Sequence, residues 1–251
     1  MNNLYLVSNR IFSSASILFF GKIIQLLLLF TAAREMGVSE FGVFSIVLAF
    51  SQFSTFFLVP GGQQGLTKIV TRLFSTKKFE ELGGVVLSTL IFFILIIILI
   101  ILLNLSFKYF NLFQQKNVFL MLTILIPITL WTVIREGISR GFSFIGISQI
   151  PHELIAPLLI LSFVFFDLSY YSSAYNFLLL WVSCFALIEV ILLTFVFLKF
   201  MRFLRAIKFK FEFHNWFDEL IPIQISNLTK AGVLRTDIIA TGIFLGAAEA
   251  G

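Results

Sequence analysis

Ionisable side chains lie within segments of this sequence that are otherwise apolar enough to sit in lipid. Lys22 is about halfway along a long apolar run near the N-terminus, and Lys230 lies in a similar run near the C-terminus. A charge at membrane depth is energetically expensive, so such a residue is a candidate functional group by default. Ammonium groups held there would attract an anionic group such as a diphosphate. The sequence therefore predicts an anion-binding site within a membrane.

Helical spacing places further polar residues near each lysine. Gln25 lies on a polar stripe that runs beside Lys22. In the C-terminal run Lys230 and Asp237 share one face, while Arg235 lies on the opposite side. We expect the substrate-binding residues to be Lys22, Gln25, Lys230 and Arg235.

Two acidic residues within the apolar runs are candidates for a different role. Glu189 lies in another apolar run and is the natural counter-charge for one of the cations. In the functional interpretation Glu189 and Asp237 couple an ion to the movement of the substrate. In the structural interpretation the acids form ion pairs, Lys22 with Glu189 and Lys230 with Asp237, that join helices. The sequence leaves both interpretations open.

These residues need a scaffold of membrane-spanning helices. The 251 residues are 59% hydrophobic and 12% charged, whereas a soluble domain has roughly 45–50% apolar and about 25% charged residues. The apolar runs are continuous rather than alternating, which favours helices over a barrel. We expect an all-α polytopic membrane protein with about seven transmembrane helices, at 11–33, 43–66, 84–105, 117–135, 150–167, 176–199 and 220–246.

Basic residues are distributed unequally between the two sides of these predicted spans. Three lie in loops on one side, whereas twelve lie in loops on the other. Because basic loops are retained in the cytoplasm, a cytoplasmic N-terminus is predicted, and the net charge of +5 indicates topology rather than affinity for nucleic acid. The twelve are Arg10, Lys68, Arg72, Lys77, Lys78, Arg135, Arg140, Lys199, Arg202, Arg205, Lys208 and Lys210.

Motifs of catalysis and metal binding are missing from the sequence. His152-Glu153 has no second histidine four residues later, as a zinc helix requires, and no phosphate-binding glycine loop ends in Lys-Ser or Lys-Thr. No Ser/His/Asp set is credible among so few polar residues. We therefore expect a protein that is not an enzyme, with no catalytic residues, no metal and no other cofactor.

A short signature follows both the first and the last apolar run. MGVSEFG at 36–42 and LGAAEAG at 245–251 match at two glycines and one glutamate when shifted by 245 − 36 = 209 residues. The same shift places Lys230 at position 21, next to Lys22. A repeat of this kind predicts two related units: a six-helix lobe at 1–215 and the first helix of a truncated second lobe at 216–251.

Three segments resemble the polysaccharide flippases, the O-antigen and capsule repeat-unit translocases of the multidrug/oligosaccharidyl-lipid/polysaccharide exporter superfamily. Residues 8–53 resemble the family's start, with Arg34, Met36-Gly37 and the Glu-Phe-Gly at 40–42. Residues 134–160 resemble its connection between helices 4 and 5, and 220–251 its seventh helix, including Arg235 and Asp237.

This resemblance implies a two-lobed transporter with a central cationic cavity and alternating access. The expected function is translocation of an undecaprenyl-diphosphate-linked oligosaccharide across the bacterial cytoplasmic (inner) membrane during biosynthesis of surface polysaccharide such as the O-antigen of lipopolysaccharide. The expected partners are this lipid-linked oligosaccharide, the bilayer and other polysaccharide-assembly proteins. The alternatives are a multidrug exporter of the same superfamily, a truncated product that does not transport, and a membrane enzyme such as a polymerase or glycosyltransferase.

Overall fold

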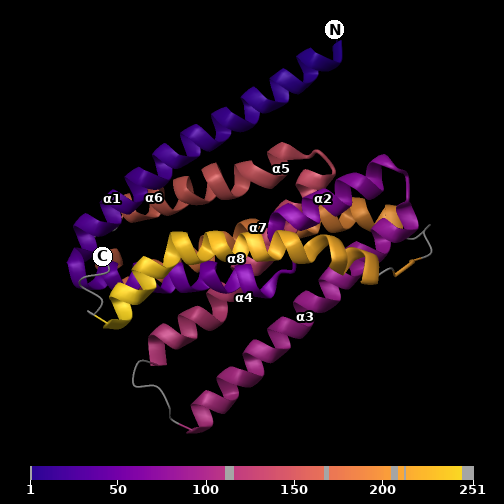
Figure 1. The fold of residues 1–251 in the computed structure, drawn as a ribbon. Helices are drawn as coiled ribbons and strands as arrows, with labels where there is room; N and C mark the ends of the chain where they lie inside the picture. Colours follow the sequence, from indigo (N-terminus) through magenta and orange to yellow (C-terminus); the bar gives the residue numbers. More distant parts are fainter. Residues whose placement is uncertain (1, 111–115, 167–169, 205–208, 212, 245–251) are drawn as a thin grey trace.

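The described part of the chain is built from helices. The computed structural model describes residues 2–110, 116–166, 170–204, 209–211 and 213–244, and Figure 1 shows most of them as long rods. In chain order the elements are α1 (Asn2–Leu58), α2 (Gly62–Ser75), α3 (Phe79–Phe110), α4 (Lys116–Gly141), α5 (Ile145–Ile150), the π-helix η1 (Pro151–Ile155), α6 (Ala156–Phe166), the 3-10 helix η2 (Tyr170–Ser172), α7 (Ala174–Leu204) and α8 (Phe213–Phe244).

Several of these helices could cross a membrane. The chain is therefore an all-α polytopic membrane protein, as the sequence predicts, although the described residues give five candidate spans rather than seven. Each is long and apolar enough to cross the hydrocarbon core. The five are Ser14–Leu58, Phe79–Asn104, Leu120–Gly141, Gly146–Phe166 and Ala174–Leu192.

The predicted span 11–33 and most of the predicted span 43–66 lie in α1, which ends at Leu58, while residues 62–66 belong to α2. In α1 the candidate span Ser14–Leu58 has 45 residues and would extend about 68 Å as one straight helix, more than twice the hydrocarbon thickness of about 30 Å. Gly37 interrupts the helix with φ 74° and ψ 171°, a conformation that essentially only glycine adopts. In Figure 1 the N-terminal arm of α1 runs to this break, and the second arm turns back beside α4. The element α1 thus consists of two helical arms joined at Gly37.

The seventh predicted span, at 220–246, lies in α8 as far as Phe244, and its last two residues fall outside the described part of the chain. This helix is not among the five candidate spans found in the described residues. Charged residues are spread along this helix, so it is less apolar than the others. α8 begins at Phe213, close to the boundary predicted between 215 and 216. The division into lobes at that boundary stays a prediction. The charged residues of α8 are Asp218, Glu219, Lys230, Arg235 and Asp237.

The signature at 36–42 joins two distant helices. Glu40 follows the break at Gly37, and its Oε2 accepts a hydrogen bond from the backbone N–H of Ala174 at 2.8 Å. Ala174 is the first residue of α7. A carboxylate at a helix N-terminus satisfies a free N–H group and interacts favourably with the helix dipole. The signature therefore fixes the start of α7 against α1.

A second break separates α1 from α2 at Pro60-Gly61-Gly62, where proline removes a backbone hydrogen bond. Gly61 has a positive φ of 67°. Its N–H donates to Gln224 Oε1 at 2.7 Å, and its carbonyl accepts from Asn227 Nδ2 at 2.9 Å. Gln224 also donates to the carbonyl of Phe56. Side chains of α8 thus satisfy the backbone groups freed by the break, which lipid could not do.

The closest helix packing joins α2 to α4. Gly137 and Gly141 of α4 are one helical turn apart and allow α2 to approach closely, an arrangement typical of membrane helices. The hydroxyl of Thr67 donates to the Gly137 carbonyl at 3.1 Å, and that of Thr71 donates to the Gly141 carbonyl at 3.3 Å. These two glycines therefore hold α4 beside the break between α1 and α2.

Replacing Gly37 by alanine should destabilise the turn between the arms of α1. Nothing lies within 4 Å of the added methyl group, so the cost comes from backbone strain alone. We expect a loss of about 1 kcal/mol or more in the free energy of unfolding, measured by thermal unfolding in detergent. Gly146→Ala is the control, because a methyl group there meets only Ile150 Cδ1, at 3.6 Å. Equal stability of the two variants would contradict the assigned role of Gly37.

Candidate functional site

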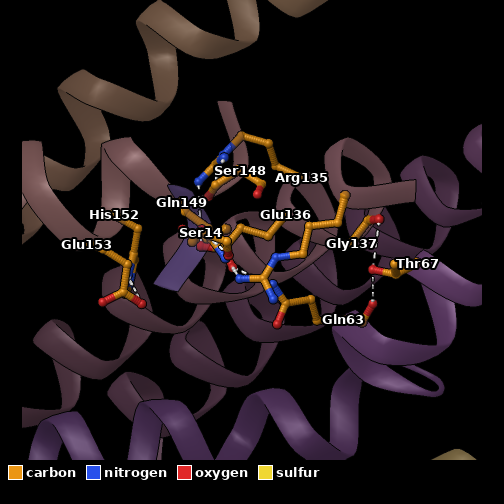
Figure 2. Close-up of polar contacts among 12 residues, drawn as sticks. Ser14, Gln63, Thr67, Arg135, Glu136, Gly137, Ser148, Gln149, His152 and Glu153 are labelled. Atoms are coloured by element: carbon orange, nitrogen blue, oxygen red, sulfur yellow. Dashed lines mark hydrogen bonds and ion pairs between the residues drawn. The ribbon is translucent and has the colours of Figure 1, made fainter. Parts of the chain in front are cut away.

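A largely buried network of charged and polar side chains lies between six helical elements, α1, α2, α4, α5, η1 and α7. α4 supplies Arg135 and Glu136, and α7 supplies Glu189. The N-terminal arm of α1 supplies Lys22, and η1 supplies Glu153. Figure 2 shows Arg135, Glu136, Gln149 and Ser14 close together, with Gln63 and Thr67 of α2 on one side and His152 and Glu153 on the other.

The deepest part of the network is an ion pair between α4 and α7. Arg135 Nε lies 2.8 Å from Glu189 Oε2 and 3.1 Å from Oε1, and the two side chains are only 2% and 8% exposed. Thr132 donates to the same carboxylate at 3.2 Å. Arg135 Nη1 also donates to the carbonyl of Ile147 at 2.7 Å. Because the pair is buried and has additional hydrogen bonds, it fixes α4 against α7 and α5.

Glu136 extends the network from α4 towards α2. Its carboxylate accepts a hydrogen bond from Gln63 and lies 3.4 Å from Arg140 Nη2. Its Oε1 lies 3.9 Å from Arg135 Nη2, and that nitrogen is buried without a hydrogen-bond partner in the described structure. Adjacent residues of one helix thus reach in different directions, Arg135 to α7 and Glu136 to α2.

Lys22 forms the exposed end of the network. Its Nζ lies 3.2 Å from Glu153 Oε2 and donates to Gln25 Oε1 at 3.0 Å. The Lys22 side chain is 62% exposed, whereas that of Glu153 is 15% exposed. Close packing brings the partners together, since a methyl group on Gly21 would lie 2.7 Å from the Glu153 carbonyl. Lys22 therefore combines one acidic partner with an open side that a ligand could reach.

The π-helix η1 explains how Glu153 reaches Lys22. It spans Pro151–Ile155 within the candidate span Gly146–Phe166. Proline removes one backbone hydrogen bond, and the wider π turn changes the direction of the side chains that follow. His152 Nδ1 lies 3.9 Å from Glu153 Oε1, and its ring contacts Phe185 edge-on at 5.2 Å. The short π-helical segment thus points His152 towards α7 and Glu153 towards α1.

The structure brings together only part of the site that the sequence predicts. Lys22 and Gln25 are in contact, as expected from their spacing. Lys230 is exposed on α8, and the described contacts include none between Lys230 and Lys22. The backbone of Arg235 and Asp237 lies in α8, but their side chains fall outside the described part of the chain. The joint action of these residues in one cavity stays a prediction.

The predicted ion pair between Lys22 and Glu189 is wrong. Each residue has another partner, Glu153 for Lys22 and Arg135 for Glu189. The sequence predicts Arg135 in a basic loop, whereas α4 continues to Gly141 and buries it. Without Arg135, eleven rather than twelve basic residues lie on the predicted cytoplasmic side, so the asymmetry that predicts topology remains large.

Three residues of the network were missed in the sequence: Arg135, Glu136 and Glu153. A signal for Glu153 was available, because it follows Pro151 within an apolar run and is therefore an acid at membrane depth. The sequence does not indicate that Arg135 and Glu136 are buried, because they lie at the end of the predicted span 117–135, where charged residues are common. Only the observed extent of α4 shows that they are buried.

Comparison with known proteins gave no match to a family model, to a curated protein or to a solved structure.

Proposed function

We propose that this chain belongs to a membrane transporter that translocates a lipid-linked oligosaccharide, with Lys22 binding the diphosphate. The observation that carries the proposal is the exposed Lys22 ammonium group within a candidate span, fixed by Glu153 and Gln25. A cation at this depth is expensive unless it binds something. Glu153 and Gln25 orient Lys22 on one side and leave its other side open for an anionic group.

The remaining network supports the proposal by forming a rigid base. The buried pair of Arg135 and Glu189 joins α4 to α7, and Glu136 connects α4 to α2. A fixed base of this kind lets a transporter hold the substrate while other helices move. Glu189 is already paired, so we assign it to this base. An ion-coupling role for Glu189 would require the pair to open during transport.

Several finer features are part of the same proposal. The two arms of α1 act as separate spans, and α8 acts as a further span, which brings the number to seven. The first six spans form one lobe and α8 begins the next, as in the polysaccharide flippases that the sequence resembles. In this arrangement the membrane is the bacterial inner membrane, the N-terminus is cytoplasmic, and other polysaccharide-assembly proteins are the partners.

A multidrug exporter is the second candidate, and one observation favours it. The network contains three carboxylates, those of Glu136, Glu153 and Glu189, which could attract a cationic drug. All three are largely buried and paired with cations, whereas Lys22 is exposed. The accessible charge is thus basic, and we place the anionic substrate first.

The test of the proposed function is replacement of Lys22 by alanine in a strain that depends on the gene for this chain. Loss of a charged hydrogen bond of about 1.5–3 kcal/mol should weaken substrate binding roughly 10- to 100-fold. We expect a corresponding fall in surface polysaccharide, measured by gel and immunoblot, while Lys22→Arg retains most of it. Lys68→Ala removes an exposed lysine of α2 outside the network and is the control. Undiminished polysaccharide with Lys22→Ala at normal protein levels would reject the proposed role.

A further inference from the structure

An apolar cavity of about 260 Å³ lies on the other side of α4 from the charged network. Its walls come from α2, α3, α4, α8 and the break between α1 and α2. Lining residues on α3 extend from Val85 to Ile96, a length of about 16 Å along the helix. The cavity is thus elongated and runs nearly parallel to a candidate membrane span, Phe79–Asn104.

The cavity opens towards the lipid-facing side of α3. Ile91, Phe92 and Leu95 line it and are themselves 48%, 41% and 58% exposed, so its outer wall is open. The opposite wall contains the fully buried Leu130. In a bilayer the medium that reaches such an opening is hydrocarbon, since the surrounding solvent is lipid.

The hydroxyl groups of the cavity wall are already hydrogen-bonded within the protein. Ser88 and Thr89 are the hydroxyl residues that line it, and both donate to the backbone carbonyl of Val85, at 2.9 Å and 2.7 Å. The other lining side chains are apolar, apart from the indole N–H of Trp216. A flexible hydrocarbon chain can therefore enter without leaving either hydroxyl group unsatisfied.

Basic residues lie near the end of the cavity that Trp216 lines. The segment 209–211 crosses α3 there, because the N–H of Lys210 donates to the Glu80 carbonyl at 3.1 Å. Trp216 is close by, 3.2 Å from the position of a methyl group on Gly84. Lys77 and Lys210 are exposed at the start of α3. Exposed lysines at the membrane surface complement a lipid phosphate.

We infer that this cavity binds one acyl chain of a membrane phospholipid, with its phosphate near Lys77 and Lys210. The apolar lining, the length along α3 and the opening on the lipid-facing side suit a hydrocarbon chain, and the basic residues suit the headgroup. The bound chain fills the space beside the break at Pro60 and stabilises the junction of α1, α2 and α8. This inference does not depend on the proposed transport function.

Fluorescence quenching by brominated lipid tests the inference. Two variants each keep one tryptophan in the full chain: Trp131→Phe with Trp181→Phe keeps Trp216, and Trp131→Phe with Trp216→Phe keeps Trp181. Both tryptophans are similarly buried, at 5% and 7% exposed, but Trp181 lies in the helix core stacked on Phe185. In vesicles of phosphatidylcholine brominated on its acyl chains we expect several-fold stronger quenching of Trp216. Equal quenching of the two would overturn the inference.

Filling the cavity with a larger side chain tests whether the quenching of Trp216 comes from an acyl chain bound in the cavity or from the lipid around the protein. Thr89→Phe, with Ser88→Phe as a second variant, should remove most of the quenching while circular dichroism shows an unchanged helix content. Leu99→Phe is the matched control, because Leu99 is 52% exposed on α3 and does not line the cavity. Unchanged quenching in a folded cavity-filled variant would overturn the inference. Relief of quenching by undecaprenyl phosphate, but not by equal phosphatidic acid, would also overturn it and assign the cavity to an isoprenoid chain.

Discussion

Replacing Arg135 by leucine should lower the free energy of unfolding by about 3–5 kcal/mol, because it leaves a buried carboxylate without its counter-charge. The Glu189 side chain is 8% exposed and has Arg135 as its ion-pair partner, at 2.8 Å. Thr132 alone would remain as its described hydrogen-bond donor. The measurement is thermal or denaturant unfolding of the purified protein in detergent, followed by circular dichroism.

A double replacement distinguishes a buried ion pair from ordinary loss of packing. Glu189→Leu alone should be similarly destabilising, whereas Arg135→Met with Glu189→Leu should recover more than half of the loss, because no unpaired charge remains. Arg72→Leu is the control. Arg72 pairs with Glu219 but is 43% exposed, so its loss should cost less than about 1 kcal/mol. A similar, small effect for Arg135→Leu would mean that the pair does not support the fold.

The helices and their breaks could be predicted from the sequence because these features are local. Long apolar runs fix the positions of the spans, and Pro60-Gly61-Gly62 removes a backbone hydrogen bond and lowers stiffness, which favours a break at that point. The break at Gly37 lies at the signature that follows the first apolar run. The described residues give five candidate spans rather than the predicted seven, and the causes are also local. The two arms of α1 count as one span because only Gly37 interrupts the helix, and α8 carries charges along its length.

The partners within the site could not be predicted, because they depend on which helix faces meet. Glu189 was expected to pair with a lysine near one end of the chain, but the nearest cation is Arg135, 54 residues away. Lys22 pairs with Glu153 because η1 redirects a side chain within a span. A π turn is set by packing around Pro151 rather than by a sequence pattern.

Replacing Gly137 by leucine should cost about 3 kcal/mol, the upper end of the usual range for overpacking. Even the first added carbon would lie 2.8 Å from Leu66 Cβ and 3.1 Å from the Gln63 carbonyl, so α2 would have to move away from α4. That movement would also break the hydrogen bond from Thr67 to the Gly137 carbonyl and the contact between Gln63 and Glu136. The packing of two glycines thus positions one side of the charged network.

The matched control for Gly137→Leu is Gly146→Leu, which adds the same side chain where the nearest atom is 3.6 Å away. We expect a much lower melting temperature in detergent for Gly137→Leu and little change for Gly146→Leu.

Because Lys22 and Glu153 lie on the α1 side of the network, a folded fraction of Gly137→Leu should retain their contact. In an assay of the proposed transport, a loss of activity only in proportion to the lower protein level would show that the α2–α4 packing serves stability. A loss of that activity at equal protein level would instead couple this packing to the proposed movement of substrate. Equal melting temperatures for the two leucine variants would show that α2 and α4 are not closely packed at Gly137.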